Sequence, residues 1–276
     1  MPKLNSPKRR FLLRIRVFGR QTLNGIALGA ETARQKVRSY KRIPADSTRS
    51  IHILLMSRDV YLKPTIRCAN SIWFHAPQSQ ICIWVDSERR ALLEVFLKQF
   101  HRKDRVIIKD VPLPDKEWQR NKLEIIVAEM EKDDLFTDAD IIWNASPPKS
   151  EKPIFFVDEY ELGRRTVTRW LLKKLDLDLA IDWRMLNVSV VSLGAKSKNK
   201  ELIRRSVELY DCIRGFKPDF DLGLDDLPSI RRMSEQIALS VAVKESYEYN
   251  LLKESDSYMD GGIAESYYLG AINGYD

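Results

Sequence analysis

Short, nearly continuous hydrophobic runs alternate with helical patterns along the first half of the chain. The runs are Ile51–Met56, Ile81–Val85 and Val106–Ile108. Their lack of hydrophobic–polar alternation is typical of strands that are buried on both faces. The stretches between them predict helices over Pro64–His75, where the proline suits a first helical turn, and over Ala91–Phe100. This order of elements is typical of a mostly parallel sheet covered by helices.

The clearest helix is predicted over residues 117–132. Leu123, Ile126, Val127 and Met130 recur there at the spacing of one helical face. A fourth apolar segment, residues 135–137, follows directly. The first half of the chain therefore predicts an α/β fold with a mixed, mostly parallel central sheet flanked by helices.

The second half of the chain is less regular. A loop rich in proline, residues 147–153, precedes it. We expect further strands over 154–157 and 186–191, and helices over 164–175, 201–213 and 234–243, where Ser234 would cap the last helix. No internal repeat is evident, so we expect one continuous domain over residues 49–276, preceded by an arm of residues 1–48.

Two aspartates one residue apart, Asp138 and Asp140, follow the fourth apolar segment. Two carboxylates this close repel each other and are costly to bury without a cation. Oxygen ligands suit magnesium or manganese, so the pair predicts a metal site. The structural alternative is a polar turn at a strand end, where aspartate is common.

The aspartate pair is one of three acidic positions that fall just after predicted strands. Asp59 and Asp86 follow the first and second hydrophobic runs. Ligands of open α/β sheets bind beyond the carboxyl ends of the strands. This shared placement favours a ligand site at one edge of the sheet, although an aspartate after a strand also commonly begins a helix.

Composition excludes several other classes of protein. The three cysteines are far apart in the sequence, which argues against a disulfide framework or a zinc cluster and indicates a reducing compartment. All three histidines lie within the first 101 residues, so a histidine-based triad or a zinc hydrolase site is poorly supported. No stretch approaches the length of about 20 apolar residues that a membrane span needs.

The basic character of the chain is concentrated at its start. Residues 1–50 carry 13 Lys and Arg against two acids, a net charge of +11, and the remainder carries 33 against 37, a net charge of −4. The mildly acidic body is unsuited to nucleic acid, and we expect none as a partner. For the arm, three interpretations stay open: a basic amphipathic helix on an anionic membrane, a removable transit peptide, or a solvated terminus. We expect a cytoplasmic protein, with peripheral contact to the inner face of a membrane under the first interpretation.

Four segments together resemble the GT-A glycosyltransferases, and in particular the glycogenin and lipopolysaccharide-galactosyltransferase-like group. They are the stretch from Ser57 to Tyr61 after the first strand, Lys122, the Asp138-Ala139-Asp140 motif with Phe136-Thr137 before it, and the pair of segments around Asn187 and Gln236. The resemblance implies a single GT-A, Rossmann-like domain. It also implies a nucleotide-diphosphate sugar as donor, most simply a UDP-sugar, and a divalent cation held by Asp138 and Asp140.

The resemblance also implies roles for single residues. Ser57, Asp59 and Tyr61 would contact the nucleotide, and Asp138 would share the metal or the ribose. Lys122 would approach the sugar or the diphosphate, with a solvated lysine as the structural alternative. Asn187 would face the donor sugar. Three further residues would lie near the sugar and the acceptor: Glu235, Gln236 and Asp158. The structural alternative for Glu235 is an acid that complements the helix dipole, and for Asp158 it is a plain turn.

The chain departs from the family pattern near its C-terminus. Relatives carry His-x-x-Gly-x-x-Lys-Pro-Trp, whereas Tyr267 stands here in place of the histidine and Asn273 in place of the lysine. Either another residue, such as Asn273 or Asp276, supplies the third metal ligand, or the chain belongs to a different subfamily.

The sequence thus predicts a metal-dependent glycosyltransferase of the hexosyltransferase type that acts on a hydroxyl of a glycan or a lipid-linked acceptor. One alternative is a sugar-nucleotide nucleotidyltransferase, which normally has a glycine-rich loop after the first strand; residues 57–61 contain no glycine. The other is a non-catalytic protein that binds a membrane or nucleic acid through its basic arm.

Overall fold

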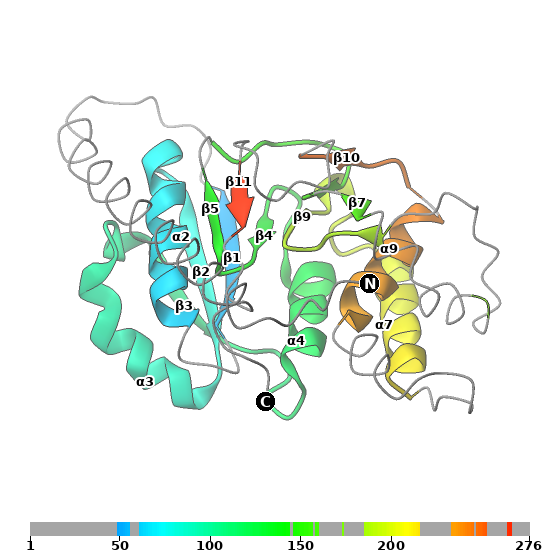
Figure 1. The fold of residues 1–276 in the computed structure, drawn as a ribbon, viewed down its shortest axis with the longest axis horizontal. Helices are drawn as coiled ribbons and strands as arrows, with labels where there is room; N and C mark the ends of the chain where they lie inside the picture. Colours follow the sequence, from blue (N-terminus) through cyan, green and yellow to red (C-terminus); the bar gives the residue numbers. More distant parts are fainter. Residues whose placement is uncertain are drawn as a thin grey trace, which may run out of the picture.

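The computed structural model describes residues 49–55, 61–143, 146–156, 158–159, 173, 185–215, 233–245, 247–252 and 264–266, the last group and 158–159 as backbone only. Figure 1 shows a central sheet with helices on both of its faces. The basic arm, Ser57, Asp59, Tyr267, Asn273 and Asp276 lie outside the described residues.

A seven-stranded sheet forms the centre of the fold, in the order β10-β6-β9-β4-β1-β2-β3. The strands are β1 (Ser50–Leu55), β2 (Gln80–Val85), β3 (Val106–Asp110), β4 (Leu135–Thr137), β6 (Ile154–Phe155), β9 (Val190–Ser192) and β10 (Asn250–Leu251). β1 pairs in parallel with β2 and β4, and β2 with β3, whereas β9 runs antiparallel to both β4 and β6. The expected mixed, mostly parallel sheet is therefore confirmed.

Neighbouring residues along each strand enter two separate hydrophobic cores. Leu135 of β4 packs in the core that contains Ile72 and Trp73 of α2 (Leu62–His75). Phe136, the next residue, packs in the opposite core. That core is built with α4 (Trp118–Glu124), α7 (Lys200–Gly215) and α9 (Ser234–Lys244). Because side chains of a strand alternate between faces, covering both faces requires the continuous hydrophobic runs seen in the sequence.

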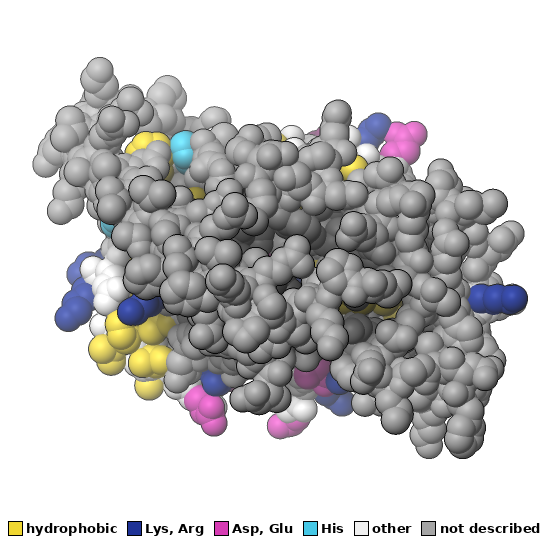
Figure 2. Space-filling model, in the orientation of Figure 1, with side chains coloured by type: hydrophobic (Ala, Val, Ile, Leu, Met, Phe, Trp, Pro, Cys, Tyr) yellow, Lys and Arg dark blue, Asp and Glu magenta, His cyan; other side chains and the backbone are white. Residues whose placement is uncertain are grey.

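The covering helices form two groups in Figure 1, with α2 and α3 (Ser87–Phe96) on the left and α4, α7 and α9 on the right. Asp86 caps α3, because its carboxylate accepts a hydrogen bond from the backbone N–H of Arg89 at 2.9 Å. Hydrophobic side chains reach the surface over α3 at the lower left of Figure 2, and Val95 of this helix is 66% exposed. Trp73, Trp84 and Trp143 are buried, as expected of core residues. The N-cap residue of α9 is Met233, and Ser234 is the first residue of the helix, so the predicted position of the cap is wrong.

Two predicted elements are interrupted in the structure. The run 186–191, expected as one strand, divides into β8 (Met185–Leu186), a turn and β9. β8 pairs with β7 (Asp158–Glu159) outside the main sheet. The helix expected over 117–132 ends in a π-helical turn, Ile125–Glu129. The turn between β8 and β9 lies beside the aspartate pair, because the carbonyl of Ser189 accepts a hydrogen bond from the N–H of Asp138.

The segment after the aspartates also leaves the main sheet. β5 (Ile141–Trp143) pairs antiparallel with β11 (Ala264–Ser266) in a separate two-stranded sheet, seen at the top centre of Figure 1. In the parts of the chain that are described, the cysteines are free and no helix is long and apolar enough to cross a membrane.

Candidate functional site

Asp138 begins the turn at the carboxyl end of β4. Its backbone N–H donates to the carbonyl of Ser189 at 2.7 Å, and its own carbonyl accepts from the N–H of Ile141 at 3.2 Å. β1, β2 and β3 run parallel to β4, and antiparallel β9 begins where β4 ends. The aspartate pair therefore lies at the sheet edge where the sequence predicted a ligand site.

Lys122 of α4 forms an ion pair with Asp138, with 2.7 Å between Nζ and Oδ1. The side chain of Lys122 is only 4% exposed, whereas that of Asp138 is 29% exposed. The ammonium also lies 5.3 Å from the centre of the Phe136 ring. The alternative of a solvated lysine is therefore wrong, because this ammonium is buried and directed at the first aspartate of the motif.

Asp140 is half-buried and lies close to the carboxylate of Asp138. Burial is the main cause that raises the pKa of Asp140 to about 7, and the negative charge of Asp138 raises it further. The ammonium of Lys122 acts in the opposite direction without cancelling these effects. One lysine thus leaves the aspartate pair short of positive charge.

Glu235 brings a third carboxyl group to the same place. It lies in the first turn of α9, which packs against α4, and it is 4% exposed. Among the described residues its Oε2 has no hydrogen-bond partner. Burial raises the pKa of Glu235 to about 7; Lys122 lowers this pKa and Asp138 raises it, so all three groups lie within electrostatic range. The first turn of a surface helix would leave such an acid in solvent, so the helix-dipole alternative does not explain its burial.

Asn187 occupies the break between β8 and β9. Its side-chain oxygen accepts a hydrogen bond from the N–H of Ser189 at 2.8 Å, and its carbonyl accepts from the N–H of Phe156 at 3.3 Å. These bonds close the turn whose Ser189 carbonyl holds Asp138. An asparagine that bonds its own backbone two residues on favours such a turn over a continuous strand. The residue is 5% exposed, so this fold buries it beside the aspartate pair.

Ser240 fixes the position of α9 against this turn. Its hydroxyl donates to the carbonyl of Gln236 at 2.6 Å and accepts from the N–H of Leu186 at 2.9 Å. Gln236 and Ser240 share a helical face, as the sequence predicted, but Ser240 is buried and holds the helix. Gln236, one turn earlier, is half-buried.

The remaining predicted site residues are only partly described. Tyr61 precedes α2 and is half-buried, and its carbonyl accepts from the hydroxyl of Thr65 at 2.8 Å. The backbone of Asp158 pairs with Leu186 in β7 and β8, one residue from Asn187, but its side chain is outside the described part of the chain. Among the described residues, the structure thus brings together Lys122, Asp138, Asp140, Asn187 and Glu235.

Asn121 was not singled out from the sequence, although it supports the site. It is fully buried, and its side chain bonds the N–H and the carbonyl of Leu113 at 2.9 and 2.8 Å and the carbonyl of Lys116 at 3.0 Å. These bonds fix the loop that leads into α4, and therefore the start of the helix that carries Lys122. A polar residue on the buried side of a predicted amphipathic helix was the available signal.

The donor chemistry of the cluster suits a hard divalent cation. Asp138 and Asp140 offer carboxylate oxygens, which magnesium and manganese prefer. Burial and the charge of Asp138 raise the pKa of Asp140 despite Lys122, and Oε2 of Glu235 lacks a hydrogen-bond partner among the described residues. Within the described residues no three His, Cys, Asp or Glu side chains gather closely enough to enclose a metal, and the expected third ligands, Asn273 and Asp276, lie outside that part of the chain.

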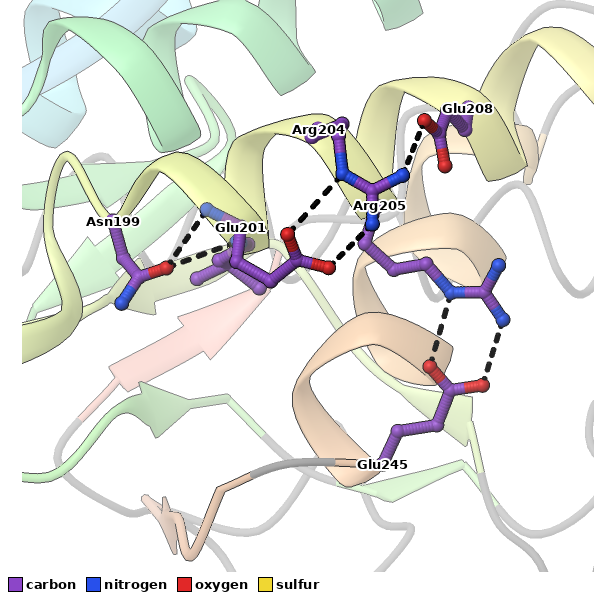
Figure 3. Close-up of polar contacts among 7 residues, drawn as sticks. Asn199, Glu201, Arg204, Arg205, Glu208 and Glu245 are labelled. Atoms are coloured by element: carbon purple, nitrogen blue, oxygen red, sulfur yellow. Dashed lines mark hydrogen bonds and ion pairs between the residues drawn. The ribbon is translucent and has the colours of Figure 1, made fainter.

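A second polar cluster lies between α7 and α9 and has a different character. Figure 3 shows Arg204 between Glu201 and Glu208, and Arg205 against Glu245 at 2.9 and 3.1 Å. These residues line a pocket of about 220 Å³. Because each of its arginines is already paired with glutamate, this pocket is a network of surface ion pairs and a poor anion site.

Comparisons with known proteins give structural matches only. No protein-family model and no curated protein matches the chain. The galactosyltransferase LgtC, solved with donor and acceptor sugar analogs, is 13% identical, with a TM-score of 0.44 over 66% of this chain and 69% of LgtC. The glycosyltransferase GlyE of Streptococcus pneumoniae is 12% identical, with a TM-score of 0.44 over 74% of this chain and 45% of GlyE, so the chain spans less than half of its length.

A third glycosyltransferase, PaToxG, is 12% identical, with a TM-score of 0.40 over 86% of this chain and 79% of PaToxG. The resemblance to glycosyltransferases expected from the sequence is thus found again among solved structures. A likeness this distant carries no argument about donor, acceptor or metal, so the activity must be argued from the site itself.

Proposed function

We propose that this chain is a glycosyltransferase of the hexosyltransferase type. It would transfer a sugar from a nucleotide-diphosphate sugar, most simply a UDP-sugar, to a hydroxyl of a glycan or lipid-linked acceptor. Asp138 and Asp140 would hold a divalent cation, manganese or magnesium. The observation that carries the proposal is the convergence of Lys122, Asp138, Asp140 and Glu235 at the carboxyl edge of a mostly parallel sheet.

The charges of this cluster suit a diphosphate with its cation. A divalent cation, when bound, supplies positive charge that stabilises a departing diphosphate. The Lys122 ammonium provides a second positive charge on the same side, delivered by a buried side chain that α4 holds in place. Asn187 would place its amide beside the donor, because the turn that it closes also holds the backbone of Asp138.

Glu235 is our candidate for the group that handles the acceptor proton. Because its pKa is raised to about 7, its carboxylate can accept a proton near neutral pH. In an inverting reaction Oε2 would take the proton of the acceptor hydroxyl as that oxygen attacks the sugar; Asp158 is the second candidate for this role. A retaining reaction in this fold requires no such base, and Gln236, one residue further on, would then lie near the sugar as a polar contact.

Two other functions are less well supported. A sugar-nucleotide nucleotidyltransferase shares a similar sheet and metal, but residues 57–61 contain no glycine. A non-catalytic protein that acts through the arm would not require buried carboxylates at the sheet edge. Removal of residues 1–48 separates the two classes: a binding protein would lose its function, whereas the transferase should keep donor hydrolysis. We place the enzyme in the cytoplasm, with the arm as its contact to an anionic membrane.

A thermal-shift panel with UDP, GDP, CDP and TDP, each with and without manganese, tests this function. We expect stabilisation only when nucleotide and metal are both present, of about 2.7 kcal/mol at a ligand concentration 100 times the Kd. Asp140→Ala should abolish it, and Asp133→Ala, an exposed aspartate seven residues earlier, should preserve it. A panel without any nucleotide-dependent shift would overturn the proposal.

A further inference from the structure

The site contains three carboxyl groups and a single described ammonium. Asp138, Asp140 and Glu235 carry three negative charges when ionised, and Lys122 carries one positive charge, which leaves a deficit of two. This deficit equals the charge of one divalent cation. How Lys122 responds to that cation rests on the proposed metal and nucleotide site.

Lys122 already occupies one of the oxygens that a cation at this motif would need. Its Nζ lies 2.7 Å from Oδ1 of Asp138, which is the distance of a charge-assisted hydrogen bond. An ammonium and a metal ion cannot both bind one carboxylate oxygen at full strength. Entry of a divalent cation therefore either weakens this ion pair or is opposed by it.

Glu235 offers a second acceptor for the ammonium of Lys122. Oε2 of Glu235 is buried, and it has no hydrogen-bond partner in the described part of the chain. Glu235 lies on α9, which packs against the helix that carries Lys122, and the two side chains interact electrostatically. A buried acceptor without a donor costs stability. This oxygen would therefore gain from a donor that reaches it when the cation is bound.

We propose that Lys122 is a resident counter-cation that moves from Asp138 to Glu235 when a divalent cation binds. In this arrangement Lys122 neutralises Asp138 before the cation enters, and the cation replaces it there. The displaced ammonium then pairs with Oε2 of Glu235. Lys122 is thereby a positioning residue that couples occupation of the metal site to the charge balance at Glu235.

Manganese binding without nucleotide tests this exchange. We would measure the Mn²⁺ Kd by electron paramagnetic resonance of free Mn²⁺ for wild type and for Lys122→Met, which keeps an unbranched side chain at this buried position and removes the charge. Loss of the competing ammonium should tighten Mn²⁺ binding about tenfold. Lys122→Arg should stay near wild type, and so should Lys132→Met, whose lysine pairs with Glu151 on the surface at 2.9 Å.

A double-mutant cycle separates exchange from simple repulsion. Glu235→Gln removes the negative charge of the second acceptor, so it should weaken Mn²⁺ binding in the wild-type background and have little effect beside Lys122→Met. We expect a coupling of about threefold or more between the two changes. Simple repulsion between fixed charges predicts no coupling, and additive effects would overturn the exchange.

Two further outcomes are decisive. Equal or weaker Mn²⁺ binding by Lys122→Met, with binding by wild type intact, overturns this inference and leaves the proposed function standing. If no form of the protein binds Mn²⁺, both fail together. If Lys122→Met does not fold, the ¹⁵N resonance of the Lys122 ammonium in the wild-type protein tests the exchange instead. Binding of diamagnetic Mg²⁺ should shift this resonance. An unchanged resonance with Mg²⁺ bound would overturn the exchange.

Discussion

Replacing Glu235 by glutamine should stabilise the protein near neutral pH while impairing its function. The folded-state pKa of Glu235 is raised from 4.5 to about 7. The folded protein therefore holds this proton more tightly than the unfolded chain does. The associated stability is fully present below pH 4.5 and is lost as the pH rises through 7, which corresponds to about 3 kcal/mol. The neutral amide of Glu235→Gln avoids this loss.

The expected gain thus depends on pH in a defined way. In metal-free buffer, Glu235→Gln should raise Tm at pH 8 by roughly 6–12 °C, given about 2–4 °C per kcal/mol for chains of this size. The gain should shrink as the pH is lowered and disappear well below pH 4.5, where the wild-type carboxyl is neutral in both states. Differential scanning calorimetry at pH 5, 6, 7 and 8 measures it.

Glu94→Gln is the matched control, because Glu94 is exposed on α3. It should change Tm by little at every pH. A Glu235→Gln variant that is no more stable than wild type at pH 8, or a gain that is the same at pH 5 and pH 8, would refute the reasoning from burial.

Three further predictions concern single residues. Asp140→Asn should lower turnover by about a hundredfold or more, because it removes a ligand at the developing charge, and should abolish the manganese-dependent nucleotide shift. Trp84→Phe should cost about 2 kcal/mol in urea unfolding, since the indole N–H donates to Nδ1 of buried His52 at 3.0 Å and the acceptor would be left unpaired. Gly194→Ala should cost about 2 kcal/mol or more in the same assay, because φ is +55° and a Cβ would lie 2.6 Å from the carbonyl oxygen of Glu151.

Each of these changes has a control in the chain. Asp133→Asn should retain turnover and the nucleotide shift. A loss in this variant would mean that the effect is not specific to Asp140. Val95→Ala, at a position 66% exposed, should stay within about 0.5 kcal/mol of wild type. Unfolding free energies of Trp84→Phe and Gly194→Ala that match Val95→Ala would contradict the contacts assigned to them.

The sequence predicted the sheet well where hydrophobic burial alone determines structure. The runs at Ile51 and Ile81 are buried on both faces, and their lack of alternation identified them as central strands. The run 186–191 gave the same signal and was interpreted as one strand. The side chain of Asn187 bonds the N–H of Ser189, which creates a turn that hydrophobicity does not register. Local side-chain bonding thus overrode the pattern.

The sequence identified the two aspartates of the candidate site, but it did not predict the electrostatics around them. The spacing of Asp138 and Asp140 predicts a cation site, and the bound cation stays a prediction. The burial of Lys122 does not follow from the sequence, because a lysine in an amphipathic helix is normally solvated. Its burial depends on the tertiary placement of α4 over Phe136 and against α9.

The raised pKa values of Glu235 and Asp140 have the same main cause, which is burial. Each carboxyl group therefore costs stability as the pH rises and the group ionises; Asp138 adds to this cost and Lys122 reduces it. Residues chosen for stability alone would replace one acid by an amide or add a second lysine. The proposed cation would offset the stability cost of the ionised carboxylates when it binds. Its affinity would be stronger by the free energy that this relieves. Glu235→Gln should therefore reduce both the instability of the metal-free cluster at high pH and the affinity of the proposed cation.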